Sequence, residues 1–268
     1  MGSPLRAFVR VATYLAITAV LFPVQAFALR FNRKISVRLP LLYHRLCVRI
    51  LGFQIRTHGE VVAKGPVLFA CNHTSYSDIS ILGALLPASF VAKAEVAGWP
   101  FFGALAKLQR TVFVDRRPAK ATVQRDEMVQ RLESGDNLIL FPEGTSSDGN
   151  AVLPFKSALF SVALIEPNGE PLLVQPVSIA YTRLDGMPVG RALRPYFAWY
   201  GDMTLAPHFW EVAGLGYATV DVVFHHPVTI RDCGTRKDLA EHCFQAVAGG
   251  VSVANAGRLE GLRTAVAS

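Results

Sequence analysis

The amino-acid sequence predicts an α/β sandwich with a mostly parallel sheet, preceded by N-terminal helices that associate with a membrane. Two observations carry this prediction. Between residues 66 and 180, short apolar runs alternate with helix-like segments, which is the order that places helices over the faces of a parallel sheet. Residues 11–29 carry no charge and have basic residues on both sides. The chain has 268 residues, 51% of them hydrophobic, so it can bury one sizeable core.

The first segment, residues 1–55, is predicted to form the membrane-anchoring helices. Its uncharged stretch, residues 11–29, is close to the length that crosses a bilayer, whereas Pro23 and Gln25 disfavour a straight spanning helix. The flanking cations suit a helix that lies in the interface and meets anionic headgroups. Residues 39–53 are typical of a second, amphipathic helix along the same surface. Whether residues 11–29 span the membrane or lie on it stays open.

A secretory signal peptide is the competing interpretation of this segment. Arg6 and Arg10 precede the apolar run, and Ala26-Phe27-Ala28 at its end has the small residues of a cleavage site. However, the run is long for the apolar core of a signal peptide, and the basic residues 30–38 would hinder export. We therefore expect an anchor on the cytoplasmic face of the cell inner membrane.

The central segment, residues 56–248, is predicted to be one α/β domain. Its expected strands are residues 66–71, 89–92, 111–114, 137–141 and 172–180. Its expected helices are residues 77–86, 101–109, 118–134 and 156–165, and Gly135 ends the third of these. The last segment, residues 249–268, is rich in Ala, Gly, Val and Ser and is predicted to be a flexible tail.

A histidine and a carboxylate five positions apart follow the first central strand. On one continuous helix, positions i and i+5 lie about 140° apart and would not meet. In a strand-to-helix turn, His73 sits at the strand end, Asp78 lies in the first helical turn, and Thr74, Ser75 or Ser77 caps the helix. Asp78 can then fix the imidazole tautomer, which leaves His73 able to act as a general base. The structural alternative is that Asp78 is only a helix-start residue.

A second polar segment, Phe141-Pro142-Glu143-Gly144-Thr145, follows the apolar run at residues 137–140. In open α/β sheets the ligand crevice lies beyond the carboxyl ends of the strands, where both His73 and Glu143 are expected.

These segments resemble the lysophospholipid acyltransferase family, whose first motif is His-x4-Asp after Asn and whose third is Phe-Pro-Glu-Gly-Thr. Residues 90–96 with residues 111–116 are similar to the second block, which ends in a strand and an Arg, and residues 174–177 resemble the fourth. The four blocks stand in family order over roughly residues 64 to 180. The resemblance implies the glycerolipid acyltransferase type of α/β sandwich behind a helical membrane platform.

The resemblance also implies a lysolipid O-acyltransferase of membrane lipid biosynthesis. His73, held by Asp78, would deprotonate a lysolipid hydroxyl, which attacks the thioester of acyl-CoA or acyl carrier protein. These thioesters are co-substrates, and no other cofactor is expected. The expected substrate-binding residues are Glu143, Gly144, Thr145, Arg116 and, as a weaker candidate, Lys93.

One departure from the family pattern concerns the acceptor. The third motif usually continues with an Arg associated with the acceptor phosphate, whereas here Ser146 follows Thr145, and Asp148 adds an acid. Losing this cation should weaken recognition of a phosphate monoester by roughly 1.5 to 3 kcal/mol, unless Lys156 compensates. Residues 197–210 look like the lyso-ornithine lipid acyltransferase subgroup, whose zwitterionic acceptor would tolerate Asp148. Lysophosphatidic acid and lyso-ornithine lipid both stay open as acceptors.

The remaining sequence features allow more than one interpretation. The net charge of +7 concentrates beside the apolar N-terminal segment, which favours an anionic membrane and an acidic carrier protein over nucleic acid. The aromatic residues between positions 196 and 210 are typical of a core or an interfacial belt, and alternatively of an acyl-chain pocket. A noncatalytic lipid-binding protein of the same fold is the alternative function, which the intact His73, Asp78 and Glu143 disfavour.

No metal site is expected. The four cysteines, Cys47, Cys71, Cys233 and Cys243, have no metal-like spacing, and Cys71 is expected to be a small core residue. The adjacent His225 and His226 would point to opposite faces of a strand. A secreted serine hydrolase is disfavoured because the sequence has no Gly-x-Ser-x-Gly elbow.

Overall fold

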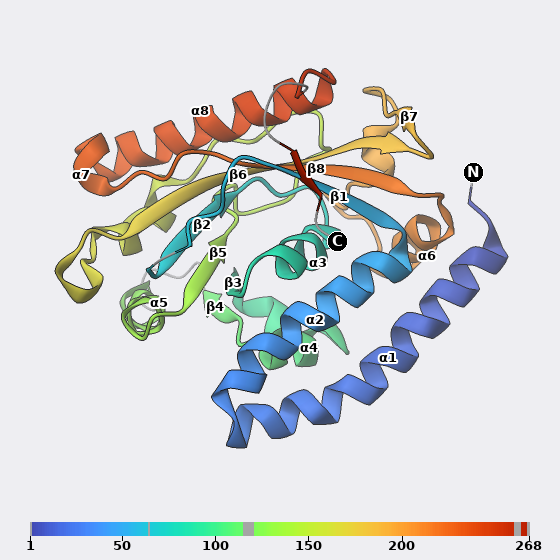
Figure 1. Cartoon of the computed structure of the whole chain (residues 1–268), viewed down its shortest axis with the longest axis horizontal. Coiled ribbons are helices and arrows are strands. Elements are labelled where there is room, and N and C mark those ends of the chain that lie inside the picture. The colour runs from blue at the N-terminus through green and yellow to red at the C-terminus, as the bar shows by residue number, and fades with distance from the viewer. Residues whose placement is uncertain (1, 64, 115–120, 260–263, 267–268) are drawn as a thin grey trace.

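The computed structural model describes residues 2–63, 65–114, 121–259 and 264–266. Within these residues, nine strands form one sheet, and helices cover both of its faces (Figure 1). The predicted α/β sandwich is therefore confirmed.

Parallel strands form most of the sheet. The order of strands is β4 (Val112–Val114), β3 (Ala88–Lys93), β5 (Asn137–Leu140), β2 (Val67–Cys71), β6 (Leu173–Leu184), β8 (Ala218–Phe224), β1 (Phe53–His58) and β9 (Thr264–Val266), and β7 (Met187–Pro188) pairs with β6. The strands from β4 to β6 run parallel, whereas β8 is antiparallel to β6. The carboxyl ends of β2, β3 and β5 thus lie at one edge of the sheet, which is where ligands bind in such folds.

Two layers of helices enclose the sheet (Figure 1). One face is covered by α1 (Pro4–Phe31), α2 (Arg33–Leu51), α3 (Ser77–Leu85), α4 (Phe102–Leu108) and α6 (Leu205–Gly214), and the other by α5 (Ala121–Glu133), α7 (Ile230–Cys233) and α8 (Arg236–Asn255). Short 3₁₀ helices lie at Ala94–Gly98, Ser157–Leu164, Pro167–Gly169 and Arg194–Tyr196. β2 is apolar throughout because Val67 and Phe69 pack on the α3 side, while Leu68 and Ala70 pack on the α8 side.

α1 and α2 form a helical hairpin. The turn at Asn32 caps α2, since its side chain accepts a hydrogen bond from the Ile35 amide at 3.1 Å. α1 continues through Pro23. Gln25, which was expected to weaken α1, instead ties the hairpin to the domain, because its Nε2 donates to Ser36 O at 2.9 Å and to Leu108 O at 2.8 Å.

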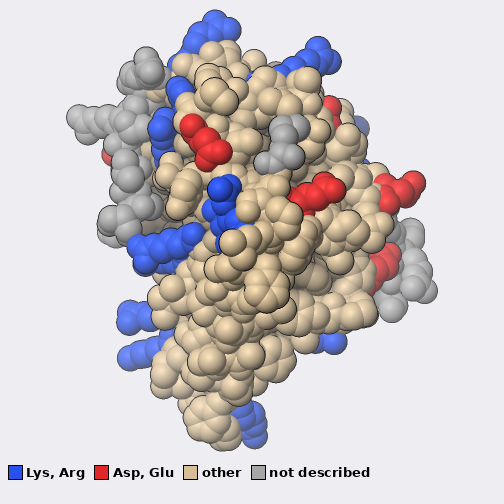
Figure 2. Space-filling view, turned by 90° about the vertical axis from the view of Figure 1, so that its right-hand side faces the viewer, with Lys and Arg blue, Asp and Glu red and all other residues tan. Residues whose placement is uncertain are grey.

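The outer side of α1 is apolar and exposed. Its exposed large apolar residues are Leu5, Phe8, Val9, Leu15, Val20, Phe22, Val24, Phe27, Leu29 and Phe31. In the described part of the chain, α1 alone is long and apolar enough to cross a membrane by length and composition, yet it also packs along α2, α4 and α6. Figure 2 shows that the lower part of this side of the molecule, which holds the hairpin, displays no acidic side chain and has lysines and arginines at its edges.

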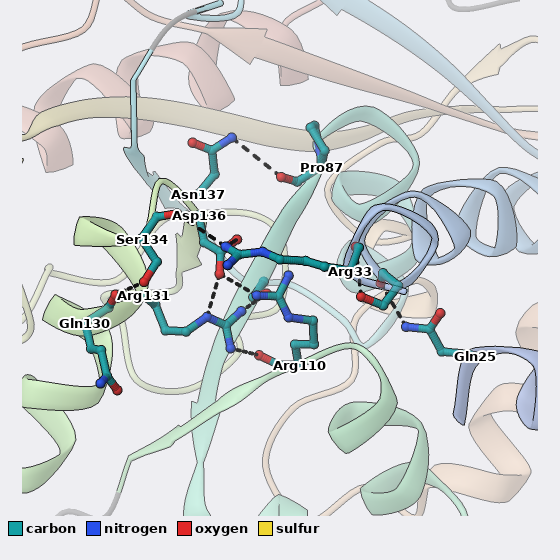
Figure 3. Close-up of polar contacts among 11 residues, drawn as sticks. Gln25, Arg33, Pro87, Arg110, Gln130, Arg131, Ser134, Asp136 and Asn137 are labelled. Atoms are coloured by element: carbon teal, nitrogen blue, oxygen red, sulfur yellow. Dashed lines mark hydrogen bonds and ion pairs between the residues drawn. The ribbon is translucent and has the colours of Figure 1, made fainter. Parts of the chain in front are cut away.

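The turn of the hairpin is tied to the sheet by a cluster of arginines around one carboxylate (Figure 3). Arg33, Arg110 and Arg131 all form ion pairs with Asp136, which precedes β5. Burial alone would raise the pKa of Asp136, but the charges of Arg110 and Arg131 outweigh it and hold this pKa below its usual value. The carboxylate therefore stays ionised and joins α2, α5 and the sheet.

Most of the predicted strands and helices agree with the structure. The differences occur where tertiary packing determines the backbone conformation. The strands expected at residues 66–71, 89–92, 111–114 and 137–141 correspond to β2, β3, β4 and β5. Residues 157–164 form a 3₁₀ helix rather than an α-helix. β1 was missed: Gly52, at a φ of 80°, ends α2, and the chain enters the sheet at once, so the expected boundary at residue 55 falls inside a strand.

The expected flexible tail was wrong for its first part. α8 continues to Asn255, so the expected boundary at residue 249 falls inside a helix. The small residues there serve packing, because a Cβ on Gly250 would collide with Ser178 Oγ and lie 2.7 Å from the His225 ring. Residues 264–266 form β9, which pairs with β1.

Two neighbouring glycines test this packing. Gly250→Ala should destabilise the fold by about 1–3 kcal/mol because α8 must move away from β6. Gly249→Ala is the matched control: no heavy atom lies within 4 Å of its added Cβ, so the higher helix propensity of Ala should stabilise α8 by up to about 1 kcal/mol. Urea unfolding midpoints measure both changes. Equal stabilisation by the two substitutions would contradict the docking of this end of α8.

Candidate active site

The structure brings the two polar segments together at the carboxyl ends of β2 and β5. The His73 amide donates a hydrogen bond to Glu143 Oε1 at 2.6 Å. The imidazole ring of His73 stacks on Phe141, with ring centroids 4.1 Å apart and an interplanar angle of 18°. The segment from Phe141 to Thr145 therefore holds both the main chain of His73 and one face of its imidazole ring.

Asp78 holds the edge of the same ring. Its Oδ2 accepts hydrogen bonds from His73 Nδ1 at 2.9 Å, from the Thr74 amide at 2.7 Å and from the Ser75 amide at 2.9 Å, and its Oδ1 accepts one from the Tyr181 hydroxyl at 2.8 Å. An ionised carboxylate can only accept, so Nδ1 of a neutral His73 carries the proton and Nε2 keeps a free lone pair. His73 is 21% exposed, whereas Asp78 is fully buried.

The start of α3 differs from the expectation. Tyr76 stands at the N-cap position and makes no side-chain capping bond, and neither Thr74, Ser75 nor Ser77 caps the helix. Asp78 does not cap the helix either: its carboxylate binds the amides of Thr74 and Ser75, in the turn before the helix. The same side chain thus shapes the turn and orients His73.

Glu143 is engaged by the backbone through both carboxylate oxygens. Oε1 accepts from the His73 amide, and Oε2 accepts from the Leu153 amide at 2.8 Å. Burial of this carboxyl raises its pKa to about 7, although both hydrogen bonds oppose the shift. Glu143 therefore fixes the main chain at His73.

The loop after Glu143 passes next to His73. The Ser147 amide donates to His73 O at 2.9 Å. Gly144 has a φ of 68°, and a Cβ there would lie 2.7 Å from Lys156 Nζ, so the glycine leaves room for this ammonium group. Within the described residues, the amides of Thr145 and Ser146 donate no hydrogen bond. The loop that contacts the main chain of His73 thus offers two amides without a hydrogen bond, and it has the Lys156 cation beside Gly144.

Asp148 lies in the same loop and is held by Asn150. The Asn150 amide and its side-chain Nδ2 each donate to the carboxylate at 2.9 Å. These hydrogen bonds, with a smaller contribution from Arg191, lower the pKa of Asp148. Arg194 in turn donates to Asn150 Oδ1 at 3.0 Å. The loop therefore carries a fixed negative charge two residues after Ser146, the position at which the family pattern has an Arg.

Lys93 and Arg116 are the two remaining residues that were predicted to bind substrate. Lys93 is the last residue of β3, at the same edge of the sheet as His73, and is half-buried. Arg116 lies outside the described residues.

Sequence reasoning missed two residues that contact the pair of His73 and Asp78. Phe141 belongs to the second polar segment, yet its stacking on His73 required knowledge that β2 and β5 are neighbours. Tyr181 lies in β6 after its apolar run, and its side chain is on the face of the sheet that packs against α3. The sequence feature that could have indicated this contact was a tyrosine at the end of an apolar strand.

Two apolar spaces adjoin the site. A cavity of about 180 Å³ is lined by Tyr76 and Ser77, near the turn that carries His73, and continues between α1, α2 and α4. A more open groove between α1 and α6 is lined by Trp99, Trp199 and Trp210. The aromatic segment at residues 196–210 contributes to both spaces, since Phe209 lines each of them. Cys71 is fully buried, as expected of a core residue.

Replacing Glu143 by Gln tests its buried carboxyl. The pKa of about 7 lies above the ordinary 4.5, so its contribution to stability is full below pH 4.5 and is lost as the pH rises through about 7. Glu143→Gln cannot ionise and leaves one backbone N–H facing an NH₂ group, which should cost about 1–3 kcal/mol. We expect the stability deficit of the variant to shrink as the pH rises through this window. Urea unfolding at several pH values measures it, and parallel pH profiles would contradict the assignment.

The sequence and the fold were compared with known proteins. The family model described as Acyltransferase matches residues 54–180. The chain is 45% identical over 244 residues to the lyso-ornithine lipid O-acyltransferase of Brucella abortus, an alignment that covers 90% of this chain and 91% of that protein. It is 40% identical to the lyso-ornithine lipid O-acyltransferase of Rhizobium meliloti, over 84% of this chain and 78% of that protein.

More distant similarities agree. The chain is 33% identical to the 1-acyl-sn-glycerol-3-phosphate acyltransferase of Neisseria gonorrhoeae, over 64% of this chain and 63% of that protein. Its fold matches the crystal structure of the 1-acyl-sn-glycerophosphate acyltransferase of Thermotoga maritima with a TM-score of 0.64, at 20% identity and with 93% of each chain covered. The chain therefore belongs to the lysophospholipid acyltransferase family and is an enzyme that transfers acyl groups.

Proposed function

We propose that this enzyme transfers a fatty acyl group from acyl-CoA or acyl carrier protein to the hydroxyl of lyso-ornithine lipid. The observation that carries the chemistry is the imidazole of His73, whose Nδ1 is held by Asp78 while Nε2 has no hydrogen bond to any residue that the structure describes. The similarity to two proteins named lyso-ornithine lipid O-acyltransferases supports the acceptor.

The reaction needs no covalent enzyme intermediate. Nε2 of His73 takes the proton from the acceptor hydroxyl as its oxygen attacks the thioester carbonyl. The carbon–oxygen bond forms, the carbon–sulfur bond breaks, and the imidazolium returns the proton to the leaving thiolate. Asp78 stabilises the imidazolium in between. The unused amides of Thr145 and Ser146 are the donors that we assign to the oxyanion of the tetrahedral intermediate.

The loop charges favour a zwitterionic headgroup. Ornithine carries ammonium and carboxylate groups, which match the fixed anion of Asp148 and the ammonium of Lys156. A phosphate monoester would meet the carboxylate of Asp148 without the arginine that usually follows Thr145. We therefore assign Asp148 and Lys156 to the headgroup, and Glu143 to the positioning of His73 rather than to direct contact with the acceptor.

The two apolar spaces suit the two chains that the reaction brings together. We assign the cavity between α1, α2 and α4 to the acyl chain of the donor, because Tyr76 and Ser77, which follow His73 in the chain, line it. The open groove between α1 and α6 is assigned to the chain of the acceptor, since it lies beside the exposed apolar side of α1.

The N-terminal hairpin gives the acceptor its route from a membrane. We propose that α1 lies on the cytoplasmic face of the inner membrane with its apolar side in the lipid. Arg10 and Arg33 are engaged by the protein, since Arg10 donates to Leu215 O at 2.8 Å and Arg33 pairs with Asp136. Exposed cations of the hairpin that remain for anionic headgroups include Arg6, Arg30, Lys34 and Arg38.

A panel of acceptors tests both the chemistry and the headgroup. Detergent-purified enzyme is incubated with labelled acyl-CoA or acyl carrier protein and with lyso-ornithine lipid, lysophosphatidic acid or other lysophospholipids. We expect product with lyso-ornithine lipid and little with lysophosphatidic acid. Efficient acylation of lysophosphatidic acid alone would overturn the assigned acceptor, and product from no acceptor would favour a noncatalytic lipid-binding protein.

A matched pair of histidine variants completes this test. His73→Ala removes the general base and should lower kcat by about 10²- to 10⁴-fold. His226→Ala is the control, because His226 is exposed and its ring bonds only to the neighbouring Pro227 O. If His73→Ala turned over substrate as fast as His226→Ala, the proposed mechanism would be wrong.

A further inference from the structure

Tyr181 on β6 contacts the carboxylate of Asp78 through the oxygen that His73 does not use. Its hydroxyl donates a hydrogen bond to Asp78 Oδ1 at 2.8 Å. The other oxygen, Oδ2, accepts from His73 Nδ1 and from the amides of Thr74 and Ser75. Asp78 is fully buried, so bulk water cannot replace a missing donor. Among the residues that the structure describes, Tyr181 is the donor that holds Oδ1.

The hydroxyl of Tyr181 is held in place as a proton donor. Its ring stacks on Phe197, with centroids 5.2 Å apart and an interplanar angle of 11°, and it meets Phe53 edge-on at 6.1 Å. Burial raises the pKa of Tyr181 well above its usual value, and the charge of Asp78 raises it further, so the hydroxyl keeps its proton near neutral pH. Only 3% of Tyr181 is exposed, so any effect that it has on a reaction passes through Asp78 rather than through contact with a substrate.

The strand that carries Tyr181 is irregular directly after this residue. Tyr181 pairs with Val220 of β8, but Arg183 pairs with Thr219, so Thr182 is an extra residue on β6 at this point of the ladder. Such bulges are common next to active sites, where they re-aim a side chain. The irregularity lies where a side chain of β6 has to reach Asp78.

A donor on Oδ1 changes how tightly His73 and Asp78 hold an extra proton. The two side chains share a hydrogen bond, so they take up this proton as a pair. A hydroxyl that donates to the carboxylate stabilises its charged form and draws negative charge away from the oxygen that faces the imidazole. Without this hydroxyl, the carboxylate would accept a proton more readily, and it would also stabilise an imidazolium more strongly. Both effects make the pair take up the proton at a higher pH.

We propose that Tyr181 is a positioning residue that acts through Asp78. Its hydroxyl holds Oδ1 and thereby keeps the pair of His73 and Asp78 free of an extra proton near neutral pH. In that state Nε2 of His73 is able to take the proton of the acceptor hydroxyl. This inference rests on the proposed function, because it takes His73 as the general base.

Other ionisable groups surround the pair of His73 and Asp78. Burial raises the pKa values of Cys71 on β2 and of Tyr76 in the turn, so both stay neutral near neutral pH. Glu143 differs, because burial raises its pKa to about 7 and its ionisation therefore falls within the range of an activity profile. Further ionisable groups on the surrounding elements are Lys93, Lys156, His44 and Arg45 of α2, His208 and Glu211 of α6, and His58 with Asp221 of β1 and β8.

The pH profile of kcat/KM tests this inference. Detergent-purified wild-type enzyme and Tyr181→Phe acylate lyso-ornithine lipid from a labelled donor at a series of pH values. Phe keeps the aromatic ring and removes only the hydroxyl. We expect the acidic limb of the profile to move to higher pH by about one unit. Activity should therefore fall about tenfold at pH values below the limb and change little on its alkaline side, with the KM for the lysolipid unchanged.

Two comparisons locate the effect. Tyr217→Phe is the matched control, because Tyr217 is exposed and its hydroxyl has no hydrogen bond to any residue that the structure describes. Its profile should match that of the wild-type enzyme. The comparison is repeated in the Glu143→Gln variant, in which the carboxyl at position 143 cannot ionise. The shift that Tyr181→Phe causes should persist there, since Tyr181 acts on Asp78 and not on Glu143.

A second substitution keeps the test decisive if thermal unfolding shows that Tyr181→Phe does not fold. Fluorotyrosine in place of Tyr181 preserves the ring and the hydroxyl but makes the phenol more acidic and thus a stronger donor. The acidic limb should then move to lower pH, in the opposite direction to Tyr181→Phe. An acidic limb that does not move with this stronger donor would overturn the inference.

The outcomes separate this inference from the proposed function. A loss of activity by the same factor at every pH would show that Tyr181 only supports packing, and it would overturn the inference while leaving lysolipid acylation intact. A profile of Tyr181→Phe identical to that of the wild-type enzyme would have the same meaning. Failure of the wild-type enzyme to acylate any lysolipid would overturn the proposed function together with the inference.

Discussion

The buried carboxylate of Asp78 is the constraint on which the rest of the site depends. A carboxylate with no exposed surface is tolerated only when it is well paired, and four hydrogen bonds surround this one. Its partners come from the end of β2, from the turn before α3 and, through Tyr181, from β6. The interaction that orients His73 therefore also fixes how α3 joins the sheet, so the fold cannot relax without disturbing the reactive ring.

Glu143 is a second buried carboxylate, and its hydrogen bonds hold the main chain. One of its oxygens holds the amide of His73 and the other holds that of Leu153, so it links the end of β2 to the loop after β5. Two buried carboxylates thus act on one residue, with Asp78 on the ring edge and Glu143 on the backbone, while Phe141 supports the ring face. With the ring and the backbone both held, Nε2 is the ring nitrogen left for the general base catalysis that we propose.

The sequence predicted what local patterns encode. Apolar runs and their polar ends predicted β2 to β5, and the two motifs identified His73, Asp78 and Glu143 as neighbours before any contact was known. What it missed depends on contacts between distant segments. The bond from Tyr181 to Asp78 needs the register of β6, and the helical residues after Gly249 look flexible until Gly250 is seen packed on β6. Gln25 is a further example. The sequence suggested only that this polar residue weakens an apolar helix, whereas in the structure its side chain joins α1 to α2 and to the end of α4.

The central claim is that Asp78 fixes the neutral His73 as the tautomer with the proton on Nδ1. Nitrogen NMR of enzyme labelled in its histidine side chains measures this directly, with the His73 signals identified by their absence in His73→Ala. The account predicts a protonated Nδ1 and an unprotonated Nε2 in the neutral ring, and loss of this preference in Asp78→Asn. A neutral ring protonated on Nε2 in the wild-type enzyme would contradict the assignment of His73 as the base.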